Sequence, residues 1–341
     1  METTDMKLTI DEARNLAQHA MQSCGHSSDE ATIIADHLLD CELRGLSFGG
    51  LARALSVIER RAKSPQSPQS IKVIKDTPVS ATLHGGDQVG YLVAKRATDI
   101  AIDKARRTGI AVVGAHKTWY TGMFSYYLEM ITAAGYVGMI AGSGNHLVAP
   151  HGGTRARFGT NPIAFGFPTE THPVIWDIGT AAVMLGEVML KNRLGEALPE
   201  GLAYAPDGTP TQDPAQALAG AFTVWGGHKG SGLALVVQLL GMLAGAQAEP
   251  DGLTDCGLFI LVVDPAVLTD APANLASVSN YAQSVRETRP VDPSQPVRVP
   301  FDRSQQRREQ TMKIGHIDID TRVFDALTAI ISTQQEQDAT S

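Results

Sequence analysis

The chain has 341 residues, of which 43% are apolar and 19% charged, and its formal net charge is −8. A chain of this length can bury one large core or two or three smaller ones. The acidic balance gives no electrostatic reason to bind nucleic acid or an anionic membrane surface. The three cysteines are scattered and odd in number, which argues against a disulfide framework or a zinc knuckle. The acidic start is unlike a signal peptide, and no apolar run reaches the roughly 20 residues of a membrane span, so we expect a cytoplasmic globular protein.

The first sixty residues have the periodicity of helices. The patterns Thr9-x-x-Glu12 and Ser27-x-x-Glu30 are capping boxes, and each predicts the start of a helix. Apolar residues at i, i+4 and i+7 predict a third helix over residues 51–58.

A polar, proline-rich stretch at residues 64–70 predicts a domain boundary, and the pattern changes beyond it. Strands are predicted at residues 71–73, 79–83, 110–113, 136–141, 163–167, 174–176 and 258–263. Helices are predicted at residues 88–107, 123–134 and 184–191, after residue 230, at 275–286 and at 320–332, followed by a frayed tail at 334–341.

Helices at both ends with a mixed sheet between them predict an α+β fold. We expect residues 1–70 and 285–341 to form one helical domain built from both termini. Residues 71–284 should form a mixed-sheet domain with a small helical insertion around 184–250.

The sequence has no dinucleotide fingerprint of the Rossmann type. The pairs Gly142-x-Gly144 and Gly230-x-Gly232 lack the third glycine, and neither follows an N-terminal strand. A metal site is not predicted either, because the histidines around residues 146–172 have no cysteine or carboxylate at ligand spacing.

Three motifs in order along the chain resemble the malate/L-lactate dehydrogenase family, which includes ureidoglycolate dehydrogenases. They are residues 148–166 with the Gly-Thr-Asn-Pro turn at 159–162, residues 207–214, and Gly-Gly-His-Lys-Gly-Ser-Gly-Leu at 226–233. Phe-Gly-Thr-Asn-Pro-Ile-Ala-Phe-Gly and Gly-Gly-His-Lys-Gly-Ser are especially similar to the branch that reduces cyclic imino acids, the piperideine- and pyrroline-2-carboxylate reductases.

This resemblance implies an L-sulfolactate/malate dehydrogenase-like fold with a mixed-sheet domain that binds NAD or NADP. It also implies a homodimer with its active site near the subunit contact. The implied reaction is hydride transfer between the nicotinamide and a carbon beside the carboxylate of a small acid.

The resemblance also implies the residues of the site. It gives Thr160 a contact with the substrate, although the turn around it could simply precede a strand. His228 and Lys229 follow two glycines and open a helix, where backbone N–H groups and a cation suit a phosphate. The same pattern is also typical of an ordinary helix start with a solvated lysine. The predicted cofactor contacts are Trp119, Tyr120, Thr121, Asp177, Ile178, Gly179, Thr180, His228, Lys229 and, by a looser match, Arg303.

The chain departs from the family at the proton-donating end of the site. The family has Ser-His-Gly with an arginine four residues after the histidine, whereas this chain has Ser47, Phe48 and Gly49, then Ala52. Phenylalanine cannot donate a proton. Arg53 is one residue farther, about 100° around a helix, so it is not automatically equivalent; we keep Phe48 and Arg53 as substrate-contacting candidates.

Four residues and an ordered water are candidates for the missing acid–base function. Ser47 remains in place, and Glu187 lies where the imine-reducing branch has an acidic partner for its histidine. Proton donation could instead have moved to His116, to Tyr120 or to an ordered water. Ser47, Glu187 and His116 each have a purely structural interpretation as well. Ser47 can start a helix, Glu187 can be a solvated acid and His116 can be a surface loop residue.

The sequence therefore predicts an NAD(P)H-dependent oxidoreductase that acts on a small 2-oxo acid or cyclic imino acid bearing a carboxylate. Phe48 and Ala52 favour a bulkier or less charged substrate than malate. Because Phe48 replaces the proton donor, two alternatives stay open: a relative with non-redox lyase or isomerase chemistry, and a catalytically silent paralogue.

Overall fold

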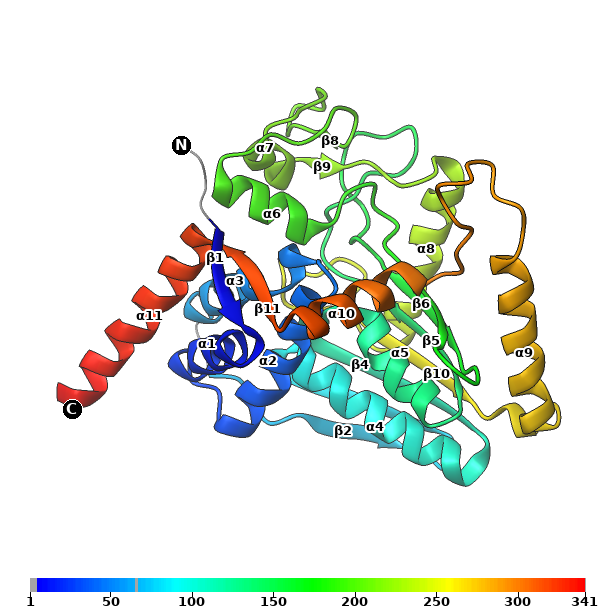
Figure 1. Cartoon of the computed structure of the whole chain (residues 1–341). Coiled ribbons are helices and arrows are strands. Elements are labelled where there is room, and N and C mark those ends of the chain that lie inside the picture. The colour runs from blue at the N-terminus through cyan, green and yellow to red at the C-terminus, as the bar shows by residue number, and fades with distance from the viewer. Residues whose placement is uncertain (1–4, 65–66, 341) are drawn as a thin grey trace. The chain divides into compact units, whose positions relative to one another are not determined.

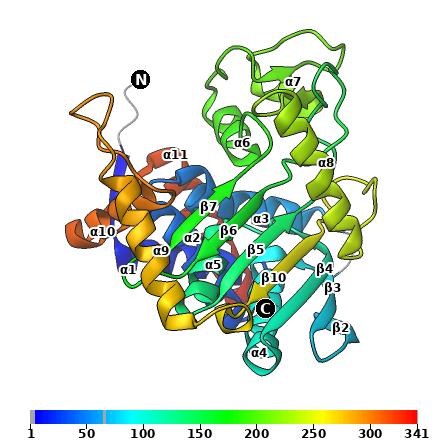
Figure 2. The ribbon, with the colours of Figure 1, turned by 90° about the vertical axis from the view of Figure 1, so that its right-hand side faces the viewer.

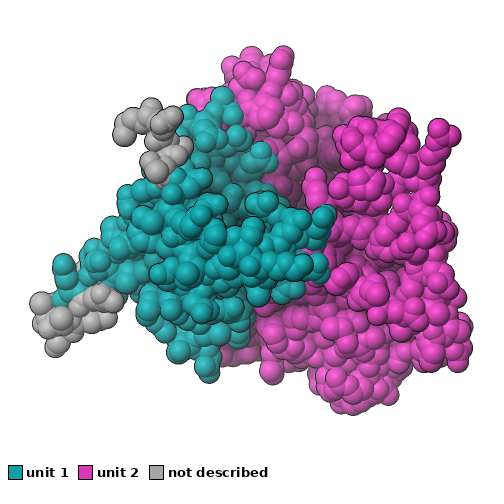
Figure 3. Space-filling view, viewed as in Figure 1, with its two compact units in different colours: residues 1–67, 185–197, 306–341 teal, residues 68–184, 198–305 magenta. Residues whose placement is uncertain are grey.

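A computed structural model describes residues 5–64 and 67–340 and confirms the α+β prediction (Figure 1). The chain divides into two compact units, coloured separately in Figure 3. Unit 1 comprises residues 1–67, 185–197 and 306–341, and unit 2 comprises residues 68–184 and 198–305. Whether the predicted helical domain of residues 1–70 and 285–341 folds independently stays a prediction.

Unit 1 is built from helices of both chain ends, and both predicted capping boxes form. The side chains of Thr9 and Ser27 accept hydrogen bonds from the backbone of Glu12 and Glu30, whose carboxylates accept in return. Helix α1 packs on α2, α3 and α11, and strand β1 pairs antiparallel with β11. The elements are β1 (Asp5–Thr9), α1 (Ile10–Ser23), α2 (Ser28–Leu43), the 3-10 turn η1 (Ser47–Gly49), α3 (Leu51–Ala62), α6 (Leu185–Leu194), β11 (His316–Asp320) and α11 (Thr321–Thr340).

Unit 2 is a sheet of seven described strands in the order β2-β3-β4-β10-β5-β6-β7 (Figure 2). Its strands are β2 (Lys72–Asp76), β3 (Ser80–Val89), β4 (Ile110–Trp119), β5 (Val137–Gly142), β6 (Ile163–Phe167), β7 (Val174–Ile178) and β10 (Leu258–Val263), with β8 (Ala203–Tyr204) paired to β9 (Ala221–Phe222) apart from it. Its helices are α4 (Gly90–Thr108), α5 (Phe124–Ala133), α7 (Pro214–Ala219), α8 (His228–Leu243), η2 (Pro265–Val267) and α9 (Ala271–Arg286). Helix α10 (Asp302–Ile314) begins in unit 2 and continues into unit 1.

The sheet of unit 2 is covered on both faces, so its position is fixed by burial. On one face α4 and α5 bury a core that includes Val113, Leu128 and Ile260. On the other face α8 packs over β4, β5 and β10, and Val237 and Phe259 are buried there. Apolar area removed from water contributes about 25 cal/mol per Å², so both helical layers hold the strands in register.

The strand directions bring the loops that carry the predicted motifs to one edge. Strand β10 is antiparallel to β4 and to β5, so β4 and β5 run together; β3 is parallel to β4, and β7 returns antiparallel through β6. The C-terminal ends of β3, β4, β5 and β7 therefore meet the beginnings of β6 and β10. We call this side of the sheet the carboxyl edge.

The structure corrects several predicted element lengths. Strands expected at 79–83 and 110–113 extend to Val89 and Trp119. Their ends are irregular, with a register shift between His84 and Gln88 and a left-handed backbone at Lys117, and this breaks the alternation that marks a strand.

The ends of the chain also differ from expectation. Strands β1 and β11 and helix α10 were not predicted. Strand β1 buries only Leu8 and α10 only Thr311, which leaves almost no apolar pattern, whereas the short alternation of Ile317 and Ile319 in β11 was overlooked. The prediction of a frayed tail at 334–341 is wrong over residues 334–340, where α11 continues. Ser341 lies outside the described residues. Residues 65–66, within the predicted domain boundary at 64–70, also lie outside the described residues.

The second half of α2 buries several ionisable side chains inside unit 1. Asp40 accepts a 2.6 Å hydrogen bond from Nε of Arg44 and pairs with Arg308 at 2.8 Å. Burial raises the pKa of Glu42 to about 7, against the 2.6 Å hydrogen bond that the backbone N–H of Leu51 donates to its Oε1. Burial, with the charge of Arg44, lowers the pKa of His37 to about 3.

The buried histidine predicts acid sensitivity. Its pKa falls from 6.5 to about 3 on folding, so the stability it contributes is present above pH 6.5 and is lost as the pH falls toward 3. The loss is at most about 1.4 kcal/mol per pH unit. We expect His37→Leu to give a shallower decline of the unfolding free energy than wild type in urea titrations between pH 6.5 and about 4.5. His19→Leu, at an exposed position of α1, is the control; equal slopes for wild type and His37→Leu would contradict the prediction.

Candidate active site

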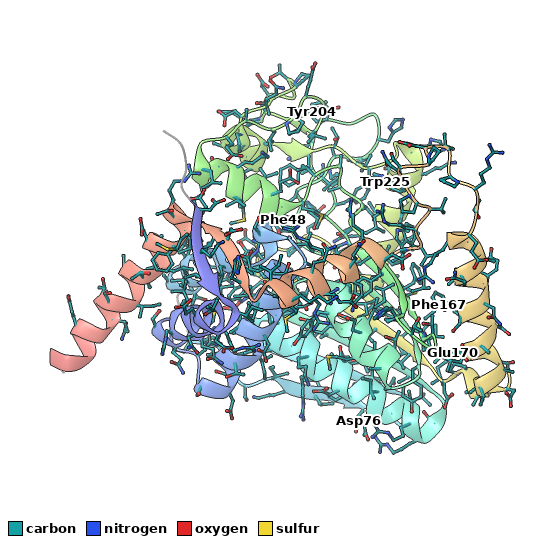
Figure 4. All side chains as sticks on the ribbon, viewed as in Figure 1. Phe48, Asp76, Phe167, Glu170, Tyr204 and Trp225 are labelled. Atoms are coloured by element: carbon teal, nitrogen blue, oxygen red, sulfur yellow. The ribbon has the colours of Figure 1, made fainter. Side chains whose placement is uncertain are left out.

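Three predicted motifs of unit 2 are joined by backbone hydrogen bonds at the carboxyl edge. The N–H and the hydroxyl of Thr180 both donate to the carbonyl of Thr160 at 3.0 Å. The N–H of Trp225, whose side chain is labelled in Figure 4, donates to the carbonyl of Thr180 at 2.8 Å. The Gly-Thr-Asn-Pro turn, the segment after β7 and the approach to α8 thus meet at one point, which we call the Thr180 junction.

Asn161 fastens the Gly-Thr-Asn-Pro turn to α8. Its backbone has a left-handed φ of 39°, a region that asparagine tolerates better than most side chains. Its buried Nδ2 donates to the carbonyl of Ala234 at 2.8 Å and to Oε1 of Gln238 at 3.0 Å. The neighbouring Thr160 is therefore held at a fixed place relative to this helix.

The start of α8 leaves room for an anionic group. Gly226 and Gly227 have φ of 63° and 61°, and no side chain of the described residues caps the helix at Gly227. The chain then folds tightly back, because a Cβ on Gly230 would lie 1.6 Å from the carbonyl oxygen of Trp225. His228 and Lys229 are exposed on this first turn. Uncapped N–H groups, the positive end of the helix dipole and a lysine together suit a phosphate.

His151 joins this helix start, a role that its sequence context did not suggest. Its backbone N–H donates to Oγ of Ser231 at 3.1 Å, and its ring lies 6.3 Å from that of His228. In the sequence, His151 lies in a glycine-rich stretch and was noted only as a histidine with no cysteine or carboxylate at the spacing of metal ligands. The hydrogen bond between distant segments is the signal, and only the fold reveals it.

The segment after β4 separates two aromatic residues that the sequence treated together. Trp119 is 1% exposed, and its Nε1 donates to the carbonyl of Asp87 at 3.0 Å, so its ring belongs to the interior. Tyr120 is half-buried, with a left-handed φ of 51°. The carbonyl of Thr121 accepts from the hydroxyl of Tyr127 at 2.9 Å. Of the two rings, Tyr120 is the one that remains accessible to a ligand.

The segment at 177–180 is anchored at both ends. The carboxylate of Asp177 accepts a 2.8 Å hydrogen bond from the backbone N–H of Ser125 in the first turn of α5. Ile178 packs in the core beneath α8, and a Cβ on Gly179 would lie 3.0 Å from Sδ of Met184, a tight contact with that side chain. Thr180 completes the segment at the junction, so its backbone is held in place.

Two predicted residues of unit 2 are not brought to the junction. Arg303 lies exposed on the first turn of α10, next to the Arg286–Asp302 ion pair of 2.7 Å. His116 packs against Gly245, just beyond the C-terminal end of α8. The 16 residues of α8 span about 24 Å, and His228 is at the other end. Burial lowers the pKa of His116, and its placement does not favour the predicted proton-donating role.

Unit 2 also contains an open polar pocket of about 640 Å³. It lies beside the 154–157 loop, and none of its lining residues belongs to the Thr180 junction. Its lining residues are His146, Thr154, Arg155, Ala156, Arg157, Ala205, Pro206, Asp207, Gly208, Ala219, Gly220 and Glu249.

In unit 1 the structure brings Phe48 and Arg53 together against Gly186 of α6. A Cβ on Gly186 would lie 2.4 Å from Nη2 of Arg53 and 3.0 Å from the ring of Phe48, so both side chains pack on this glycine. Nη1 of Arg53 also contacts Sδ of Met189 at 3.5 Å. Glu187 is the next residue of the same helix, and Phe48 is labelled in Figure 4.

The remaining residues of this cluster hold its backbone. Ser47 is exposed at the start of η1, and its carbonyl accepts from the N–H of Gly50 at 3.1 Å. Ala52 is buried, and an Arg193–Glu59 ion pair of 2.8 Å fastens α6 to α3. The position four residues after Phe48 therefore faces the interior, while Arg53 occupies the surface of α6.

The described residues limit the kinds of site further. None of their helices has the length and apolar character to cross a membrane. In the same residues, no group of three histidine, cysteine or acidic side chains could hold a metal ion. The uncapped start of α8 with Lys229 fits the phosphates of a nicotinamide dinucleotide.

Comparison with known proteins agrees with this geometry. Residues 8–328 match the malate/L-lactate dehydrogenase family. The chain is 31% identical to a Delta(1)-pyrroline-2-carboxylate reductase from Ancylobacter novellus, over 95% of this chain and 97% of that protein. A dehydrogenase from Sinorhizobium meliloti superposes with a TM-score of 0.89 at 31% identity, over 96% of this chain and 99% of that one.

The predicted sulfolactate/malate dehydrogenase-like fold is confirmed as well. The sulfolactate dehydrogenase from Methanocaldococcus jannaschii superposes with a TM-score of 0.82 at 26% identity, over 97% of this chain and 98% of that one. The match to the family covers nearly the whole chain and includes every motif on which the resemblance was based. The chain therefore belongs to the malate/L-lactate dehydrogenase family and is an NAD(P)-dependent dehydrogenase or reductase.

Proposed function

We propose that this enzyme reduces a small 2-oxo acid or cyclic imino acid at the carbon beside its carboxylate. The Thr180 junction carries the proposal, because it ties the Gly-Thr-Asn-Pro turn, the end of β7 and the approach to α8 into one rigid group.

The cofactor is assigned to the residues around this junction. Lys229 and the backbone of His228 would hold phosphate groups, with Tyr120 and Thr121 beside the ring system and residues 177–180 along the cofactor. When bound, the nicotinamide supplies the hydride. Arg303 stays a weaker proposal, and Trp119 is given only the task of supporting Tyr120.

The substrate carboxylate is assigned to the cluster of unit 1, and Thr160 keeps its predicted role as a substrate contact within unit 2. Arg53 is the cation of that cluster and would hold the substrate carboxylate, because a guanidinium can donate two parallel hydrogen bonds to it. Gly186 leaves the space in which the guanidinium lies. With Phe48 unable to donate a proton, Glu187 is the group assigned to proton transfer, and Ser47 is assigned to hydrogen bonding beside it.

The apolar side chains of the cluster favour a substrate with an apolar body. Phe48 and Met189 both lie against the Arg53–Gly186 contact. A relative is named as a pyrroline-2-carboxylate reductase, and a cyclic imino acid combines an apolar ring with one carboxylate. We therefore place cyclic imino acids ahead of dicarboxylic 2-oxo acids as substrates.

Two glycines of α8 give a direct test of the cofactor assignment. Wild type should bind NADH or NADPH in a fluorescence titration. Gly230→Ala should weaken binding about tenfold or more, because its Cβ collides with the carbonyl of Trp225. Gly232→Ala, where the same Cβ meets nothing within 4 Å, should bind like wild type. Wild type that binds neither nucleotide would sink the redox assignment.

Arg53 tests the substrate assignment. Arg53→Lys keeps the charge but loses the paired donors, so we expect KM for the carboxylate substrate to rise about tenfold, with a larger rise for Arg53→Ala. Steady-state rates with 2-oxo acids, cyclic imino acids and 2-oxo acid plus amine measure it. Arg60→Lys on the same helix is the control. An unchanged KM in Arg53→Ala would remove the assignment, and nucleotide binding without any turnover would favour the non-redox or silent alternative.

We further propose that the enzyme is a homodimer that buries an apolar face of α8. Large apolar side chains are exposed along this helix at Leu235, Val236, Leu239, Met242 and Leu243, the last at 73%. No charged residue stands between Lys229 and Glu249. A second copy of the same face meets it without charge repulsion, and apolar faces of this extent are uncommon on monomers.

Leu239 tests the dimer. Leu239→Glu should convert the protein from a dimer to a monomer in size-exclusion chromatography with light scattering, because it places a charge in the apolar face. Leu268→Glu is the control, since Leu268 is 85% exposed after η2. A monomeric wild type, or a dimer that survives Leu239→Glu, would refute this surface.

A further inference from the structure

We propose that Asp255 is a positioning residue that fixes the end of β4 and the loop after α8 for cofactor binding. The inference rests on the proposed function, because Tyr120 and Thr121 follow the first of these segments. It adds a residue that takes no direct part in binding or chemistry.

Asp255 is buried between two segments and bonds to both. It is 1% exposed, and its Oδ1 accepts a 2.6 Å hydrogen bond from the backbone N–H of Lys117. Its Oδ2 accepts from the backbone N–H of Gln247 at 3.0 Å and pairs with Nζ of Lys117 at 3.2 Å. One carboxylate therefore satisfies two backbone donors and one cation, in an interior where an unpaired donor is costly.

The held segment has an unfavourable backbone. Lys117 and Tyr120 have φ of 56° and 51°, and Asp87 on the neighbouring strand has φ of 60°. A left-handed conformation is energetically unfavourable for a residue that carries a side chain. Such a conformation persists where the surrounding contacts determine it, and the hydrogen bond from Lys117 to Asp255 acts directly at one of these positions.

Further hydrogen bonds carry the constraint to the end of β4. The N–H of Cys256 donates to the carbonyl of Thr118 at 2.8 Å, and the hydroxyl of Thr118 donates to the carbonyl of Gln88 at 2.7 Å. Residues 117 and 118 are thus fixed on both sides before the chain reaches Tyr120. Gln247, on the other side of Asp255, lies four residues after the last residue of α8.

The surrounding charges agree with a carboxylate at this position. Lys117 contributes a cation, and Nδ1 of His116 lies 3.9 Å from Oδ1 of Asp255. His84 makes an edge contact with His116 at 5.2 Å. Desolvation lowers the pKa of His116, so Lys117 is the positive partner of Asp255.

The test replaces the carboxylate by an amide of the same shape. Asp255→Asn retains an oxygen for one backbone N–H but turns an NH2 group toward the other donor and loses the ion pair. We expect nucleotide Kd to rise about tenfold, with kcat at saturating nucleotide little changed. Hydrogen exchange of the cofactor-free protein should become faster over residues 117–121. Asp264→Asn is the matched control, because Asp264 caps η2 after the other end of β10 with a 2.9 Å hydrogen bond from Ala266.

A second variant distinguishes positioning from general stability. Glycine adopts a left-handed φ without strain, so Lys117→Gly removes both the strain and the unpaired cation. In the Asp255→Asn background it should return nucleotide Kd to within about threefold of wild type. A general packing defect would lower the melting temperature of Asp255→Asn without changing its exchange over 117–121, and Lys117→Gly would then not rescue it.

The outcomes separate this inference from the proposed function. A wild type that binds no nucleotide would refute the proposed function, while faster exchange over 117–121 in Asp255→Asn would still support the positioning by Asp255. Unchanged exchange, or wild-type nucleotide affinity in Asp255→Asn at full stability, would overturn the inference.

Discussion

The hydrogen bonds that Thr180 donates to Thr160 and accepts from Trp225 join three loops of unit 2, and the proposed cofactor site depends on them. None of the three segments is a regular element at that point. Each is a loop end whose backbone would otherwise be free to move, and a loop fixed by a backbone bond loses that freedom once, during folding, rather than at each binding event. The strand directions bring the three segments to the carboxyl edge of the sheet, and the hydrogen bonds of the Thr180 junction fix the distances between them.

Glycines decide how closely these segments approach. At Gly230 a Cβ would overlap the carbonyl of Trp225, and at Gly186 it would overlap the guanidinium of Arg53. The first glycine keeps the start of α8 tight and uncapped, and the second makes room for a cation on the surface of α6. In both units, therefore, the absence of a side chain allows a close approach, of the backbone at Gly230 and of the guanidinium at Gly186.

The sequence predicted those features that leave a local pattern. Capping boxes at Thr9 and Ser27 located two helices, and alternating or continuous apolar runs located most strands, because these signals depend on neighbours within a few residues. The family motifs located the Gly-Thr-Asn-Pro turn and the start of α8. What the sequence could not provide were contacts between distant residues: the burial of Trp119, the position of His116 at the far end of α8, and the support that Asp255 gives to Lys117. Each depends on which strand lies beside which, and no local periodicity encodes that.

In the proposed reaction, the replacement of the family histidine by Phe48 goes together with a displaced arginine. A proton donor must reach the substrate, but the residue that holds the substrate carboxylate must also move if its own position becomes buried, as Ala52 is. Arg53 lies against Phe48 and Gly186, so the exchange of histidine for phenylalanine and the shift of the arginine occur in one packed group. Glu187, beside Gly186, is then the nearest acid in sequence to that group. Phe48, the guanidinium of Arg53 and the carboxyl group of Glu187 suit the proposed ring-shaped substrate with one carboxylate, because such a ring would pack on Phe48 while Arg53 would hold the charge.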